Sequence, residues 1–161
     1  MTTINAKNLT LAEVHRLLKI EKLPNGFFSS LLSLEPLTQF EQQEITHIRN
    51  DFNSYLIEGI LEGLVKALTT FPLLRLAGYY KSPLKLNLEQ DIADIVIIED
   101  EDTFITGRLD IVAINETQKT STDVKFWVLV IESKNSSIVP SAGLPQLLTY
   151  AYKSLESQQS I

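Results

Sequence analysis

The spacing of hydrophobic residues predicts a short helix near the start of the chain. Thr10 and Glu13 have the spacing of a capping box, in which each side chain bonds the backbone N–H of the other residue. Apolar residues then recur at three- and four-residue steps along Leu11–Leu18. We therefore expect a helical extension over residues 1–37 in front of a core at residues 38–161.

A much longer helix is predicted next. Thr38 and Glu41 form a second capping box, and a buried apolar stripe then recurs to about Leu68. The dipeptide Phe71-Pro72 is expected to end this helix, because proline disfavours helical backbone in the residue before it. Two glycines inside the helix are interpreted as points of close packing and not as a break: Gly59 and Gly63.

From residue 84 onward the pattern changes to alternation and to β-branched residues, which predicts strands. The strand segments are Leu84–Leu88, Ile92–Ile98, Phe104–Ile114 and Phe126–Glu132. Short polar links between them favour an antiparallel meander. The continuous apolar run at Val128–Ile131 predicts a central last strand, buried on both faces. A final helix is expected at Leu144–Glu156, so the fold class is α/β, with a long helix, a three-stranded meander and a helix.

Composition and charge narrow the range of possible functions. The chain has 161 residues, 44% of them hydrophobic, a net charge of −6 and no cysteine. These values fit one globular domain and exclude disulfides, thiolate zinc sites and a polycation that coats nucleic acid. The N-terminal residues lack the apolar core of a signal peptide, and no stretch approaches the roughly 18 apolar residues of a membrane span. We expect a cytoplasmic protein without a membrane partner.

The candidate chemistry lies at the end of the last strand. Glu132 and Lys134 project from one face because side chains alternate along a strand. In a meander, Asp110 of the preceding strand can lie beside Glu132. Two carboxylates at a buried face are costly unless a cation lies between them, and Mg²⁺ or Mn²⁺ fits oxygen ligands. The alternative is a solvated strand end with Asp110 at its rim.

The final helix adds two polar side chains. Gln146 and Tyr150 are four residues apart and share one helix face, from which they can reach a phosphate, a base or Lys134. Alternatively, Tyr150 is a core aromatic residue and Gln146 a surface residue.

Together, these motifs resemble the PD-(D/E)xK nuclease superfamily, especially its RecB-type branch and the nuclease domain of type I restriction motor subunits. The resemblance rests on Gly107–Asp110, Glu132–Lys134 and Gln146-x-x-x-Tyr150. It implies a restriction-endonuclease-like α-β-β-β-α-β core with a mixed central sheet. It also implies Asp110, Glu132 and the Ser133 carbonyl as metal ligands, Lys134 as the catalytic lysine, and Gln146 and Tyr150 as supporting or DNA-contacting residues.

Two features depart from the family pattern. No proline precedes Asp110, and the chain lacks a strand after the last helix, so we expect a fragment of a longer protein or an open sheet edge. Family members often add a glutamate from the first helix. Glu58 is preferred because Glu62 is expected to point more toward solvent, although a solvated helical glutamate remains the alternative for both.

Two main functions follow from these residues. The first is Mg²⁺-dependent hydrolysis of DNA, in a nuclease domain of restriction-modification or repair type. The second is an inactive nuclease-fold module that binds DNA or further subunits. A purely structural α/β domain is a third interpretation.

Several basic residues form either a local phosphate-facing patch or a scattered distribution: Arg75, Lys81, Lys85, Arg108, Lys134 and Lys153.

Overall fold

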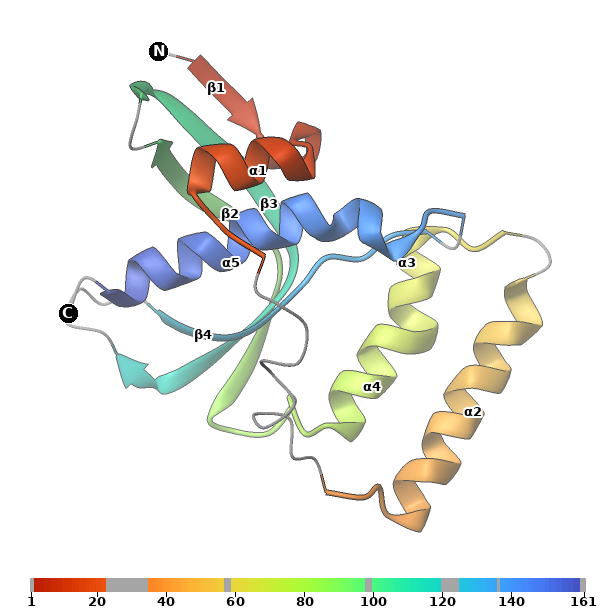
Figure 1. The fold of residues 1–161 in the computed structure, drawn as a ribbon. Coiled ribbons are helices and arrows are strands. Elements are labelled where there is room, and N and C mark those ends of the chain that lie inside the picture. Colours follow the sequence, from red (N-terminus) through yellow and green to blue (C-terminus); the bar gives the residue numbers. More distant parts are fainter. Residues whose placement is uncertain are drawn as a thin grey trace.

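A mixed, open sheet of four strands organises the fold, with helices packed around it (Figure 1). The computed structural model describes residues 2–22, 35–56, 59–97, 100–119, 125–135 and 137–159. The α/β class predicted from the sequence is therefore confirmed. Within these ranges, no helix has the length and apolarity needed to cross a membrane.

The predicted meander is present, but its central strand differs from the prediction. Strands β2 (Leu84–Ile97), β3 (Asp100–Lys119) and β4 (Lys125–Ile131) pair in antiparallel order. In the described sheet β4 pairs with β3 alone, and Val128 is exposed, so the prediction of a central β4 was wrong. The central strand is β3, whose run Ile111–Ile114 is buried throughout.

Strand β2 joins two segments that the sequence predicted separately. It runs without interruption from Leu84 to Ile97, although Glu89 in its middle adopts a positive φ of 49°. Positive φ is uncommon for residues other than glycine, and it interrupts the alternation of side chains along a strand. The polar Glu89–Asp91 stretch therefore interrupts the alternation of apolar and polar residues in the sequence, although the strand continues on both sides of it.

The N-terminal residues contribute a strand to the sheet and a helix to the core. Strand β1 (Thr2–Asn5) pairs in parallel with β3, which makes the sheet mixed. A short 3₁₀ helix, η1 (Ala6–Asn8), leads to α1 (Leu11–Leu18), which begins at the predicted capping box. Val14 and Leu18 of α1 are buried in the main core.

The predicted long helix is divided. It consists of α2 (Gln39–Tyr55), α3 (Glu62–Val65), the π-helical turn η3 (Lys66–Thr70) and α4 (Phe71–Leu76). Gly59 has φ of +76° between α2 and α3, so it marks a break rather than close packing. Pro72 does not end a helix but lies in the first turn of α4, where a missing N–H is tolerated.

The expected buried stripe is also absent from α2, which has no buried residue. Phe40 is exposed, and a groove of about 920 Å³ lies between α2 and α4. The capping box of Thr38 and Glu41 is present as predicted. Two apolar residues of α2, Phe40 and Ile48, therefore line this groove instead of a closed core.

The main core lies between the sheet and two helices that cover one of its sides. Helix α5 (Leu144–Gln159) follows the 3₁₀ turn η4 (Pro140–Gly143) and crosses the sheet beside α1, whereas α2, α3 and α4 form a separate group (Figure 1). Tyr150 of α5 is completely buried in the same core cluster as Ile105 and Leu109 of β3. This packing fixes α5 relative to the strand ends that carry the acidic residues.

Candidate active site

Asp110 and Glu132 come together where β3 and β4 meet. Ile111 pairs with Ile131 in the antiparallel ladder, so the next position along the two chains brings Asp110 opposite Glu132. The backbone N–H of Ser133 donates a hydrogen bond of 2.6 Å to Asp110 Oδ2. This bond holds the turn after β4 against β3 and orients the Asp110 carboxylate.

Glu132 is the most buried charged group of the site. Its side chain is 4% exposed, and Lys134 Nζ lies 2.5 Å from its Oε1 atom. The Oε2 atom is buried and has no hydrogen-bond partner among the described residues. Burial raises the pKa of Glu132, the ammonium of Lys134 opposes this, and the negative charge of Asp110 adds to it. The surroundings of this carboxyl group therefore disfavour its negative charge.

A chain of hydrogen bonds connects Lys134 to the central strand. Lys134 Nζ donates to Gln146 Oε1 at 3.3 Å, and Gln146 Nε2 donates to the Tyr150 hydroxyl at 2.7 Å. The hydroxyl in turn donates to the Arg108 carbonyl oxygen at 2.9 Å. The two residues of the Q-x-x-x-Y motif thus share a helix face and position the lysine, and burial raises the pKa of Tyr150.

We expect Tyr150→Phe to destabilise the protein by about 1 kcal/mol. The substitution keeps the buried ring but leaves the Arg108 carbonyl and the Gln146 amide without the hydroxyl between them. Denaturant unfolding measures the change. The control is Tyr80→Phe, at an exposed tyrosine, which should lie within about 0.5 kcal/mol of the wild type. Equal effects of the two substitutions would contradict this role of the hydroxyl.

A second lysine, which the sequence analysis missed, lies at the other acidic residue. Lys66 Nζ is 3.0 Å from Glu62 Oε1 and 3.5 Å from Asp110 Oδ1, and its side chain is 15% exposed. Burial lowers the pKa of Lys66, but the hydrogen bond to Glu62 and the charge of Asp110 outweigh it, so the pKa is raised. The four-residue spacing of Glu62 and Lys66 was the available sequence signal.

The sequence offered two helical glutamates for the site, and the structure describes one of them. Glu58, the preferred candidate, lies outside the described residues. Glu62, which was expected to point more toward solvent than Glu58, has a side chain that is 41% exposed and pairs with Lys66, and its negative charge contributes to the raised pKa of Glu132. The break at Gly59 changes the direction of the chain, so helical angles counted from α2 do not apply to Glu62.

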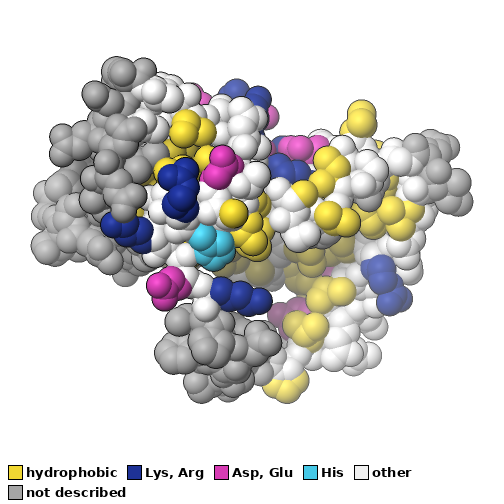
Figure 2. Space-filling view, turned by 45° about the horizontal axis from the view of Figure 1, so that its top comes forward, with side chains coloured by type: hydrophobic (Ala, Val, Ile, Leu, Met, Phe, Trp, Pro, Cys, Tyr) yellow, Lys and Arg dark blue, Asp and Glu magenta, His cyan; other side chains and the backbone are white. Residues whose placement is uncertain are grey.

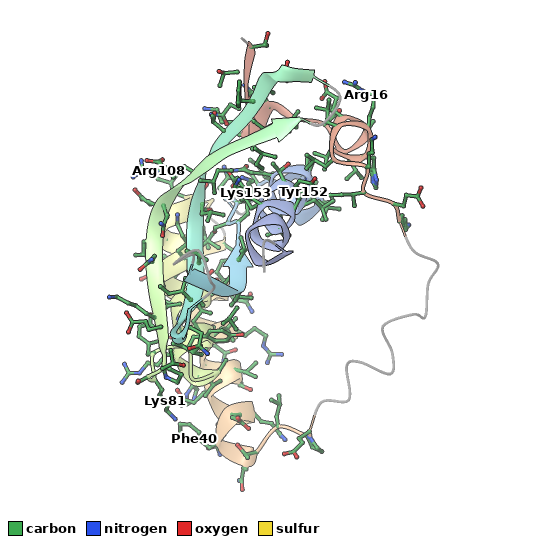
Figure 3. The ribbon with its side chains drawn as sticks, turned by 90° about the vertical axis from the view of Figure 1, so that its left-hand side faces the viewer. Arg16, Phe40, Lys81, Arg108, Tyr152 and Lys153 are labelled. Atoms are coloured by element: carbon green, nitrogen blue, oxygen red, sulfur yellow. The ribbon has the colours of Figure 1, made fainter. Side chains whose placement is uncertain are left out.

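The candidate basic residues do not form one patch. Lys85 pairs with Glu116 at 3.2 Å and Arg108 with Glu89 at 3.1 Å, both on the surface. Arg108, Lys81 and Lys153 lie at separate places in Figure 3, and basic and acidic side chains are interspersed on the face shown in Figure 2. The scattered distribution is therefore the one observed.

The site has donors of the kind that a hard divalent cation takes. Asp110 and Glu132 offer carboxylate oxygens, and Glu132 Oε2 is buried without a hydrogen-bond partner among the described residues. Within the described ranges, no three acidic or histidine side chains form a metal-holding group, so a cation here needs backbone oxygens or water as well. No family model, curated protein or solved structure matches the chain. Function has to be inferred from the site itself.

Proposed function

We propose that the chain is a nuclease domain of the PD-(D/E)xK type that hydrolyses phosphodiester bonds of DNA with Mg²⁺ or Mn²⁺. The observation that carries this proposal is the position of Glu132 beside Asp110: Lys134 pairs with one carboxylate oxygen of Glu132, and the other has no partner in the described part of the chain. Two neighbouring acidic groups of this kind are unfavourable unless a cation neutralises them. The order of helix, meander and helix supports a restriction-endonuclease-like core.

Each residue has a definite role in this proposal. Asp110, Glu132 and the backbone carbonyl of Ser133 would hold the cation, which when bound supplies a water of lowered pKa and charge stabilisation at a phosphate. Lys134 orients the attacking water or stabilises negative charge on the phosphate. Gln146 and Tyr150 fix the Lys134 ammonium through their hydrogen bonds.

The charge of the chain bears on its partners. A net charge of −6 and scattered basic residues give weak attraction for DNA phosphates. Stable DNA binding is therefore expected to come from further domains or subunits, as in a restriction or repair complex. The cleavage assay consequently needs low salt and a high concentration of the protein.

The direct test is cleavage of supercoiled plasmid DNA by the purified protein. We expect nicking with Mg²⁺ or Mn²⁺ and none with excess chelator, with products that carry the ends left by phosphodiester hydrolysis. Absence of cleavage with either cation, over a range of protein concentrations and at low salt, would contradict the proposal.

Lys134→Met is expected to lower the cleavage rate about 100-fold, because it removes the ammonium beside Glu132 and leaves the carboxylate pair in place. Cation binding should persist in this variant. The control is Lys22→Met, at an exposed lysine, which should cleave like the wild type. Rates are measured at several cation concentrations, and a loss that excess cation restores would show that Lys134 acts on metal binding instead.

A second candidate function is a DNA- or protein-binding module without turnover. It is favoured by the ammonium groups that already lie at both acidic residues, Lys66 at Asp110 and Lys134 at Glu132. Calorimetric titration with Mn²⁺ separates the two functions. A module of this kind shows no cation affinity that depends on Asp110, whereas the nuclease does.

A further inference from the structure

Lys66 contacts Asp110, the carboxylate that the proposed cation would also use. The two oxygens of Asp110 have different partners: Oδ2 accepts the Ser133 N–H at 2.6 Å, and Oδ1 faces Lys66 Nζ at 3.5 Å. The ammonium is closer to Glu62, at 3.0 Å. Lys66 is thus shared between a strong partner on its own helix and a longer contact across to the sheet.

We propose that Lys66 is the resident countercharge of the metal-free site, which a divalent cation displaces from Asp110 while the ammonium stays with Glu62. This inference rests on the proposed function. In it, Lys66 is a positioning residue that sets the cation affinity. It differs from Lys134, which pairs with Glu132 and is linked to α5 through Gln146.

The local structure suits such an exchange. Lys66 is the first residue of the π-helical turn η3 and lies four residues after Glu62, so both side chains project from the same side of the helix. Because the Glu62 contact is local, it persists when the contact to Asp110 is lost. Glu62 is also the more exposed partner, at 41% against 18% for Asp110, so the ammonium moves toward solvent as it leaves the sheet.

Two consequences follow from this arrangement. A positive charge held at Asp110 weakens the binding of a second positive charge there, so removing it should tighten cation binding. The same removal leaves two neighbouring acidic groups with less compensation, so the metal-free protein should become less stable. Both changes come from the loss of the Lys66 charge. A bound cation replaces that charge, so cation binding should restore the stability that the substitution removes.

The experiment is calorimetric titration of the whole chain with Mn²⁺, for the wild type and the neutral variants Lys66→Met and Lys66→Gln. We expect both variants to bind Mn²⁺ about tenfold more tightly than the wild type. Their metal-free melting temperatures should fall, and saturating Mn²⁺ should restore most of the loss. Lys66→Arg keeps the charge and should bind close to the wild type. Lys7→Met is the exposed control and should change neither quantity.

The outcomes separate this inference from the proposed function. If the wild type binds Mn²⁺ through Asp110 but the neutral variants bind equally or more weakly, Lys66 is not a competitor and only this inference fails. If neither the wild type nor the neutral variants bind Mn²⁺, both fail. If one neutral variant does not fold, which circular dichroism shows, the other decides.

Discussion

Replacing Asp110 with Asn is expected to reduce DNA cleavage about a thousandfold and to remove cation binding. The amide keeps the size of the side chain, and its oxygen can still accept the Ser133 N–H, so the turn after β4 should hold. The variant loses the negative charge that a divalent cation needs beside Glu132. Cleavage rates and Mn²⁺ titration on the same preparations measure both effects.

The same substitution should lower the pKa of Glu132. Burial is the largest cause of its raised pKa, and the negative charge of Asp110 adds to it. Removing that charge favours the ionised form of Glu132, which NMR titration of the carboxyl can follow. Asp91→Asn is the matched control, because Asp91 is 86% exposed on the neighbouring strand β2. If this control lost activity equally, the effect would be one of general charge and not of the site.

The acidic pair could be predicted from the sequence because strands obey simple rules. Alternation predicts Glu132 and Lys134 on one face, and their side chains do meet, although β4 ends at Ile131, before both residues. The predicted antiparallel pairing of β3 and β4 continues to Ile111 and Ile131, which brings Asp110 next to Glu132. The four-residue spacing of Gln146 and Tyr150 likewise fixes a shared helix face. Each of these inferences depends on local geometry that the residues themselves determine.

Other features depend on tertiary structure and could not be predicted in this way. Strand β1 has four residues and a polar composition, and it is a strand because it pairs with β3 far along the chain. Gly59 looks like any helical glycine until its φ of +76° is known. The spacing of Glu62 and Lys66 indicates their pairing, but the contact of Lys66 with Asp110 joins segments far apart in the sequence and could not be predicted from it.

The break at Gly59 also affects the choice between Glu58 and Glu62 as the helical glutamate of the site. In an uninterrupted helix from Thr38, the direction of the Glu62 side chain could be calculated from its position relative to the residues of α2. With α3 beginning at Glu62, that residue and Lys66 are oriented by α3 and η3 alone. Lys66 of this short segment therefore reaches Asp110 of β3 while it is paired with Glu62.

Replacing Gly107 with Val is expected to destabilise the protein by about 2 kcal/mol, which lowers the melting temperature by roughly 4–8 °C. A Cβ atom at Gly107 would lie 2.8 Å from both Cε1 and the hydroxyl oxygen of Tyr150, which is fully buried. Strand propensity alone favours Val over Gly, so the expected sign comes entirely from this close approach. Because Tyr150 must shift, its bond to the Arg108 carbonyl should weaken, and with it the support of Lys134 through Gln146. Gly63→Ala is the control: apart from the adjacent helix backbone, no described atom lies within 4 Å of a Cβ there, and the helix should gain up to about 1 kcal/mol. A stabilised Gly107→Val variant would mean that Tyr150 does not occupy this position.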